Sequence, residues 1–169
     1  MPQWPVAAEN AILVGGTPFF MEYEAYDTIY PGYAVQLDDA LADHLVRRCT
    51  AEGVNVIGIA DLAQASQTGR GTWRKYDCNG ESDDSDRDLP YIAGDQVKVI
   101  SGPISVMLVL CASQDIKAGT KLQCCNGSPG MVQEYLCVTA TPCGLIAEAM
   151  EDVTTGAGEC AYIHAKLLI

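Results

Sequence analysis

The sequence is poor in basic residues. Ten Lys and Arg residues stand against 22 Asp and Glu residues, which gives a formal net charge of −12. A surface this acidic is repelled by the phosphate backbone of nucleic acids, so we expect no nucleic-acid partner. The same charge favours a soluble protein, because like-charged molecules repel one another.

The sequence also lacks a long hydrophobic run. Its longest apolar stretch, residues Val106–Ala112, is too short to cross a lipid bilayer. The first residues, Met1–Trp4, offer neither the basic start nor the apolar core of a secretory signal. We therefore expect no membrane partner, and we expect synthesis and folding in the cytoplasm.

Sequence patterns for catalysis and cofactor binding are scarce. The chain has only two histidines, His44 and His164, and they do not form an H-E-x-x-H motif. There is no G-x-S-x-G elbow, no P-loop, and no G-x-G-x-x-G after a predicted strand. His164 lies on an alternating terminal stretch, which predicts a surface or interface position. These observations predict a protein that is not an enzyme and has no cofactor.

The eight cysteines contain no C-x-x-C pair, the spacing typical of zinc and thioredoxin-type sites. Three of them, Cys111, Cys137 and Cys160, lie in apolar stretches where cysteine acts as a small hydrophobic residue. Without a secretory signal, the prediction is mostly buried free thiols. The alternative is one or two disulfides, either Cys137–Cys143 or one that uses Cys124 or Cys125.

A long acidic segment separates two β-rich parts of the chain. Residues 64–90 have no apolar periodicity, and loops of this length are usually functional or disordered. The alternation of Asp77, Asn79 and Glu81 is similar to the start of a calcium loop, but glycine sits at the fourth place and Asp88 at the twelfth. We predict a solvated acidic loop, with a weak calcium site at these three residues as the alternative.

Strand patterns dominate the remaining sequence. Sixteen Gly and eight Pro residues interrupt the chain often, as folds of short strands require. Alternating apolar residues between such turns predict strands at 19–29, 33–37, 44–50, 54–60, 96–100, 104–111, 120–125 and 131–139. Segment 104–111 is apolar on both faces, which predicts a central strand or a subunit contact. Segment 38–49 could instead form a short helix capped by Asp38 or Asp39.

The C-terminal stretch Gly144–Ile169 predicts a hairpin that completes a small β-domain. In its closing run, Tyr162, His164 and Lys166 alternate with apolar residues, as in a half-buried strand. The alternative for Ile146–Val153 is a helix, because Ala and Glu favour helices.

The first 18 residues contain three prolines and two adjacent glycines, which predicts an extended arm outside the core. This arm is either a frayed terminus or a segment that docks on a neighbouring subunit through Trp4. Residues 19–169 are predicted to form a single β-domain with the 64–90 loop as an insertion.

Several short pieces follow one another in a fixed order between Tyr30 and Ile169. They are Tyr30-Pro31-Gly32 before a strand, Val56–Asp61, Ala93–Val99, Asp115–Leu122, Ala147–Asp152, and Gly156–Glu159 before a terminal strand. In this order they resemble the small capsid decoration (cement) proteins of tailed bacteriophages. In that family an "iGiA" strand, a "v-a-G-d" turn and an "A-l-e…aG" ending recur.

The resemblance implies an all-β fold, a small β-barrel or β-tulip with an extended N-terminal arm and one long acidic loop. Members of this family commonly form trimers on the outside of an HK97-type shell. The resemblance therefore implies a homotrimer, the major capsid protein as partner, assembly in the host cytoplasm, and a place on the virion exterior. Because aromatic residues are enriched at interface cores, the candidate contact residues are Trp4, Phe19, Phe20 and Tyr23.

Two other functions compete with capsid decoration. Asp115–Thr120 is also similar to the SAF-type sugar-acid and antifreeze-like domains, which suggests a carbohydrate-binding or enzymatic β-clip module. A pocket with converging carboxylates and His44 would favour that reading. The third possibility is a metal or redox protein that uses the cysteines.

Overall fold

The computed structural model describes residues 12–37, 42, 44–50, 55–61, 76–77, 90–125, 127–136 and 144–169. Over these residues the fold is all-β, without a helix, as the strand patterns predict. None of the described segments is a helix that could span a membrane.

Five strands close into a first barrel. They are β2 (Phe19–Ala25), β3 (Ala34–Leu37), β4 (Leu45–Arg48), β5 (Val56–Ala60) and β7 (Gln96–Ser101), in the order β2-β4-β3-β5-β7. Six cross-strand pairs, from Phe19↔Ser101 to Glu24↔Gln96, join β2 to β7 in antiparallel register. The expected β-barrel is therefore present, and β4 confirms the strand rather than the helix for the segment before Cys49.

A second group of five strands also closes on itself. It consists of β8 (Ser105–Leu110), β10 (Lys121–Cys124), β11 (Val132–Glu134), β12 (Leu145–Ala149) and β14 (Glu159–Leu167), in the order β8-β11-β10-β12-β14. The ring closes because β14 pairs with β8 from Ala161↔Leu110 to Lys166↔Ser105. The predicted C-terminal hairpin is confirmed, and a helix at Ile146–Val153 is wrong because β12 supplies its backbone hydrogen bonds to β10 and β14.

Short strands extend this second ring. The strand β1 (Leu13–Gly15) pairs with β8, and β6 (Tyr76–Asp77) pairs with β14. A separate two-stranded sheet joins β9 (Asp115–Ile116) to β13 (Val153–Thr154). Part of the predicted N-terminal arm thus belongs to the sheet, since Ile12 is fully buried next to β1. Residues 1–11 lie outside the described part of the chain.

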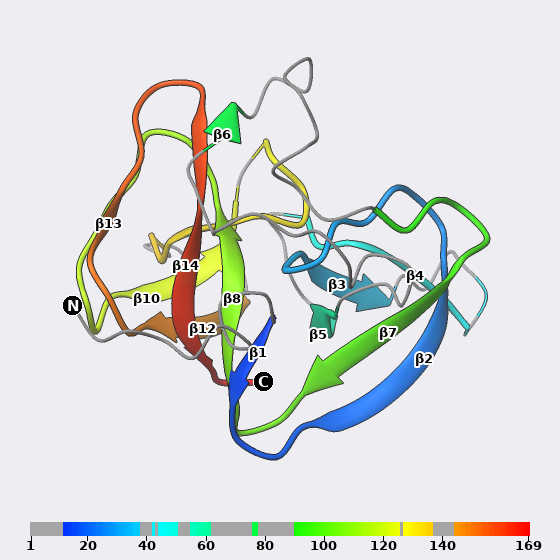
Figure 1. The fold of residues 1–169 in the computed structure, drawn as a ribbon. Helices are drawn as coiled ribbons and strands as arrows, with labels where there is room; N and C mark the ends of the chain where they lie inside the picture. Colours follow the sequence, from blue (N-terminus) through cyan, green and yellow to red (C-terminus); the bar gives the residue numbers. More distant parts are fainter. Residues whose placement is uncertain are drawn as a thin grey trace.

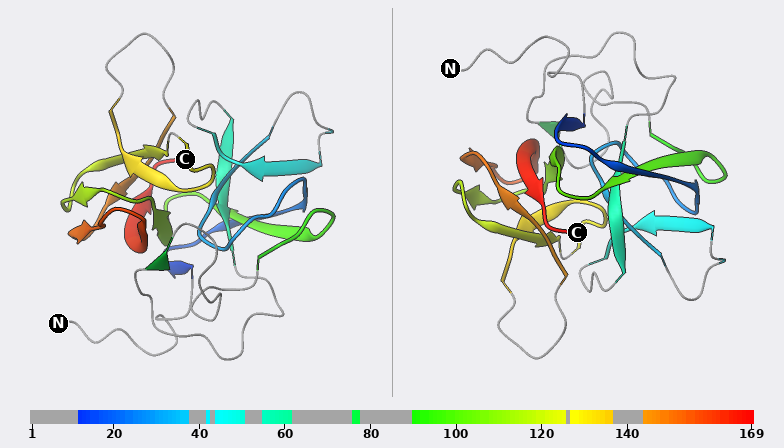
Figure 2. Two further views of the ribbon diagram at one scale, coloured as in Figure 1. Left: turned by 90° about the horizontal axis from the view of Figure 1, so that it is seen from above. Right: turned by 90° about the horizontal axis from the view of Figure 1, so that it is seen from below.

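The two barrels lie side by side, and the C-terminus ends close to where they meet (Figures 1 and 2). Backbone hydrogen bonds cross the junction: the Gly130 N–H donates to the Cys49 carbonyl and the Ala34 N–H donates to the Gly130 carbonyl, each at 2.8 Å. A single cluster of buried residues runs through both barrels, from Val35 and Ile59 to Leu108 and Ile163. The strand β8 is central, as its two apolar faces predict.

A disulfide also ties the barrels together. Cys49 follows β4 in the first barrel, Cys124 ends β10 in the second, and the two form a disulfide with a sequence separation of 75. Cys160 is likewise disulfide-bonded. The prediction of free thiols is therefore wrong for these three residues, and the alternative, a disulfide that uses Cys124, is confirmed. The fold brings Cys49 and Cys124 together although they are distant in sequence. Cys137 and Cys143 lie outside the described residues.

Two described cysteines stay as buried free thiols, Cys111 and Cys125. Cys111 donates a hydrogen bond to Cys125, which raises the pKa of Cys111 and lowers the pKa of Cys125. Cys111 is 4% exposed within the core, as expected for a cysteine that packs like a small hydrophobic residue.

Candidate interaction surface

The predicted contact residues converge on one strand, β2. Phe19 is 67% exposed and Phe20 is 56% exposed. Contact of such apolar side chains with water is unfavourable, so both would gain free energy from burial against a partner. Tyr23, on the same strand, is partly buried against the core, with its hydroxyl 3.5 Å from the Met21 sulfur. Trp4 lies outside the described residues.

Local packing explains how the two phenylalanines are held at the surface. The Phe19 ring lies against Gly102, where an added Cβ would come within 2.9 Å of Phe19 Cδ2. The Lys98 ammonium sits 4.4 Å from the centroid of the Phe20 ring and 2.9 Å from an Asp61 carboxylate oxygen. A cation over an aromatic face attracts its π-electrons, so Lys98 fixes the orientation of Phe20 without covering it.

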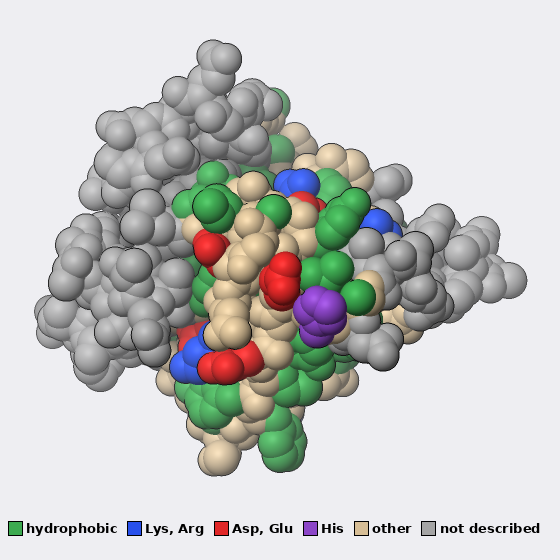
Figure 3. Space-filling view, turned by 90° about the vertical axis from the view of Figure 1, so that its right-hand side faces the viewer, with side chains coloured by type: hydrophobic (Ala, Val, Ile, Leu, Met, Phe, Trp, Pro, Cys, Tyr) green, Lys and Arg blue, Asp and Glu red, His purple; other side chains and the backbone are tan. Residues whose placement is uncertain are grey.

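The outer face of β2 is also acidic. Side chains alternate across a strand, so Phe20, Glu22 and Glu24 share one face, and all three are exposed. The Glu24 carboxylate lies 3.7 Å from His44 Nε2, with both side chains largely open to solvent. Figure 3 shows this side of the molecule, where hydrophobic side chains gather at the lower end and acidic ones flank a central strip of tan atoms.

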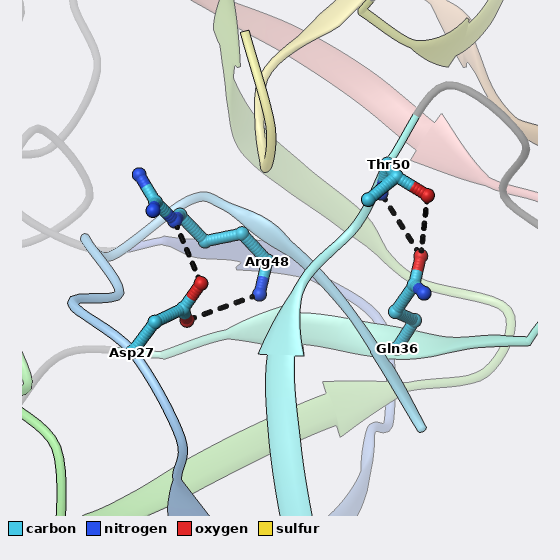
Figure 4. A network of polar contacts seen from close by, with 4 residues as sticks. All are labelled: Asp27, Gln36, Arg48 and Thr50. Atoms are coloured by element: carbon cyan, nitrogen blue, oxygen red, sulfur yellow. Dashed lines mark hydrogen bonds and ion pairs between the residues drawn. The ribbon is translucent and has the colours of Figure 1, made fainter. Parts of the chain in front are cut away.

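A polar network holds the barrel closed at the C-terminal end of β2. Asp27, just beyond β2, accepts hydrogen bonds from the Arg48 backbone N–H at 3.3 Å and from Arg48 Nε at 3.0 Å (Figure 4). In the same network, Gln36 Oε1 accepts a hydrogen bond from the Thr50 N–H at 2.9 Å. These contacts fix β4 against the end of β2 and against β3.

The first half of β2 pairs with fewer described residues than its second half does. Pairing between β2 and β4 covers only Glu24↔Leu45 and Ala25↔Val46, whereas β7 pairs with β2 along six residues. Residues Phe19–Tyr23 therefore have a strand neighbour on one side only, within the described part of the chain. The exposed phenylalanines lie on this half of the strand.

His164 does not occupy the surface position that its alternation predicts. It is 9% exposed, because β14 is an interior strand with β8 on one side and β12 on the other. Burial lowers the pKa of His164 below its ordinary value, and the nearby Glu151 carboxylate partly opposes this shift. The backbone N–H of His164 donates to Glu151 Oε1 at 2.7 Å.

The weak calcium alternative falls mostly outside the described residues. Asn79 and Glu81 are not described, and the backbone of Asp77 belongs to β6, where it pairs with Glu159. Across the described ranges, no three His, Cys, Asp or Glu side chains are grouped so that they could hold a metal ion.

The β-clip alternative depended on His44 and on Asp115–Thr120. His44 is exposed on the outside of the first barrel, whereas Asp115 lies on β9, paired with β13 in the second group of strands. The Thr154 hydroxyl and Lys117 lower the pKa of Asp115, so this carboxylate is held by its neighbours on the surface. The structure therefore does not bring His44 and this segment together.

Sequence patterns identified the exposed aromatics but not the open strand edge. Aromatic side chains in an acidic, alternating stretch indicate a contact surface from composition alone. The one-sided pairing depends on the distance along β2 at which β4 begins, with Leu45 opposite Glu24. No local signal in the sequence encodes that distance.

No protein-family model and no curated protein matches the chain. Among solved structures, it is similar to the head fiber gp8.5 N base of bacteriophage phi29, with 14% identity, a TM-score of 0.44, and coverage of 89% of this chain and 94% of that chain. It is also similar to a chain from the capsid of Myoviridae phage XM1, with 14% identity, a TM-score of 0.49, and coverage of 91% and 87%. At such low identities and TM-scores, these likenesses do not define the function of this chain.

Proposed function

We propose that the protein is a virion structural protein that binds the outside of an icosahedral capsid. In this proposal it stabilises the shell by bridging subunits of the major capsid protein. The ordered pieces between Tyr30 and Ile169, which resemble tailed-phage decoration proteins, support the class of protein. The observation that carries the mechanism is the exposed aromatic surface of β2.

Exposed phenylalanines on an otherwise acidic surface favour binding to another protein. Phe19 and Phe20 are more than half exposed on adjacent positions of one strand, and aromatic side chains that become buried dominate interface energetics. Burying them against a partner removes apolar area from water at about 25 cal/mol per Å². A second protein is the partner that supplies a complementary apolar surface at this site.

A rigid body suits a bridging role. The two barrels share one core, a disulfide and backbone hydrogen bonds across their junction. A connector of this kind resists separation of the subunits to which it is bound, because bursting the shell then also breaks the connector's contacts. Ligands that bind only the intact state stabilise it by mass action.

Binding to assembled shells tests the proposal. Purified protein is mixed with empty shells of the virus that encodes the chain, and bound protein is measured by sedimentation. We expect saturable binding to mature shells, little binding to unassembled capsid subunits, and a higher temperature of shell disruption with bound protein. Absence of binding to mature shells, or saturation without any change in shell stability, would overturn the proposal.

A further inference from the structure

The peptide groups of β2 alternate between its two neighbours. The Ala25 N–H donates to the Asp95 carbonyl at 2.8 Å, toward the β7 side, whereas the Glu24 N–H donates to the His44 carbonyl at 2.8 Å, toward the β4 side. A strand has a period of two, so the N–H and C=O groups of Phe20 and Glu22 also point to the β4 side.

The strand β4 does not reach these two residues. Its pairing with β2 ends at Glu24↔Leu45, and no described residue bonds to the outward peptide groups of Phe20 or Glu22. Among the described residues, β2 thus has an open edge of two residues, which offers two donors and two acceptors at strand spacing. Unpaired edges of this kind are templates for an added strand.

The charges of Glu22 and Glu24 protect this edge against an acidic strand, but no charge covers its first residues. Proteins that keep an edge strand free usually place charges, prolines or bulges along it. Here Phe20 is 56% exposed directly on the edge, and Phe19 is 67% exposed beside it. An added strand that covers these rings gains apolar burial in addition to backbone hydrogen bonds.

Charge decides what kind of strand fits. Glu22 and Glu24 line the outward face next to Phe20, with Lys98 of β7 opposite Glu22, in a chain with a net charge of −12. An antiparallel pair of two copies centred on Glu22 places one Glu22 opposite the other, and like charges directly opposite destabilise a strand pair. A basic side chain on the incoming strand instead forms an opposite-charge pair with Glu22.

We propose that the open edge of β2, residues Phe19–Tyr23, binds an extended segment of another protein as an added strand. The segment carries an apolar side chain that packs on Phe20 and a Lys or Arg beside Glu22. This inference deepens the proposed function, on which it rests for the class of partner, by assigning one contact site and its chemistry.

A peptide that repeats Val-Thr-Lys-Thr, capped at both ends, serves as the probe (the lysine-valine peptide), because valine and lysine two residues apart share one face of a strand, as Phe20 and Glu22 do. The full-length protein is labelled with ¹⁵N and titrated with this peptide, while amide resonances and hydrogen exchange are followed. We expect shifted resonances and slower exchange for the Phe20 and Glu22 amides. A glutamate-valine peptide, and a lysine-valine peptide with alternate amides N-methylated, should bind at least about tenfold more weakly.

A charge reversal at the edge provides the matched test in the protein. Glu22→Lys should weaken binding of the lysine-valine peptide about fivefold, because an opposite-charge cross-strand pair becomes a like-charge pair. Glu134→Lys makes the same charge change at an exposed position on β11 and should leave the affinity unchanged. Circular dichroism and thermal melting check that both variants are folded.

Several results would overturn the inference. They are an absence of peptide binding, resonance shifts away from β2, equal binding of the N-methylated peptide, and slow exchange at Phe20 and Glu22 in the free monomer. Dimerisation through β2 would show that the partner is a second copy of this chain and not a basic segment.

If the peptide binds as expected but the protein fails to bind shells, the capsid function fails and the edge site stands. If shells bind Glu22→Lys and wild type equally, the edge site fails and the capsid function stands.

Discussion

At Gly130 the chain passes too close to an aromatic ring for any side chain. An added Cβ would lie 2.3 Å from Cδ2 of Tyr33, and the backbone has a φ of +88°. Gly130 lies at the junction of the two barrels. Its N–H donates to the Cys49 carbonyl, and its carbonyl accepts a hydrogen bond from the Ala34 N–H. The residue is therefore required both for its backbone conformation and for the space that it leaves.

Gly130→Ala should lower the free energy of unfolding more than Gly119→Ala does. The two glycines have nearly equal φ values, +88° and +89°, but nothing lies within 4 Å of a Cβ at Gly119. We expect a loss of about 1 kcal/mol for Gly119→Ala from the left-handed backbone alone. Gly130→Ala should lose about 1–3 kcal/mol more from overpacking against Tyr33. Urea denaturation measures both, and equal losses would contradict the close packing of the junction.

Because of His164, the free energy of unfolding should depend on pH in the mildly acidic range. Its burial lowers the pKa in the folded state below the ordinary 6.5, so the unfolded chain takes up a proton first as the pH falls. The contribution of neutral His164 is thus fully present above about pH 6.5 and is lost progressively below it.

His164→Gln should therefore flatten the fall in unfolding free energy between about pH 6.5 and pH 5. Denaturation curves across this pH range measure the slope. An unchanged slope in His164→Gln would show that other groups cause the acid sensitivity.

The strand β14 is the element on which the second barrel depends. It pairs with β8, β12 and β6, and Ile163 at its centre is fully buried opposite Leu108. Truncation of a large side chain at such a position leaves a cavity that the surrounding strands fill only partly.

Ile163→Ala should lower the free energy of unfolding by about 2–5 kcal/mol. Leu168→Ala, one residue beyond β14 and 42% exposed, is the comparison and should cost well under half as much. Equilibrium denaturation monitored by tyrosine and tryptophan fluorescence gives both values. Similar losses at the two positions would mean that β14 is not an interior strand.

Strand positions follow from the sequence better than strand partners do. Glycine turns and apolar residues two apart predicted β3, β5, β7, β8 and β10 closely, because this information is local. Pairings such as β11 with β8, or β6 with β14, join residues that are distant in sequence. The burial of His164 depends on long-range pairings of the same kind, those of β14 with β8 and β12, so alternation within β14 placed it wrongly at the surface. The open edge of β2 was missed for the same reason.

The molecule as a whole consists of two barrels held as one body. The Cys49–Cys124 disulfide closes a loop with a sequence separation of 75 across their junction. A cross-link of this length restricts the unfolded chain and stabilises the folded state by up to about 4 kcal/mol in the chain-entropy model. This stabilisation acts on both barrels together, because the disulfide joins strands of different barrels.

The double variant Cys49→Ala/Cys124→Ala should lose most of this free energy of unfolding, measured by denaturation without reductant. The matched control is Cys111→Ala/Cys125→Ala, which removes two buried sulfurs without removing the Cys49–Cys124 cross-link. We expect a loss of about 1–2 kcal/mol for this control from packing alone. Equal losses for the two double variants would contradict a stabilising link between the barrels.

Cryo-electron microscopy of shells mixed with the protein tests the central claim most directly. We predict density for the two barrels on the outer surface of the shell, in contact with more than one capsid subunit, with Phe19 and Phe20 covered by a neighbouring chain. The variant Phe19→Ser/Phe20→Ser should need about thirtyfold more protein for the same occupancy, as expected for the loss of a central hot spot. Undecorated shells, or density in which β2 faces solvent and the variant binds as well as the wild type, would contradict the claim.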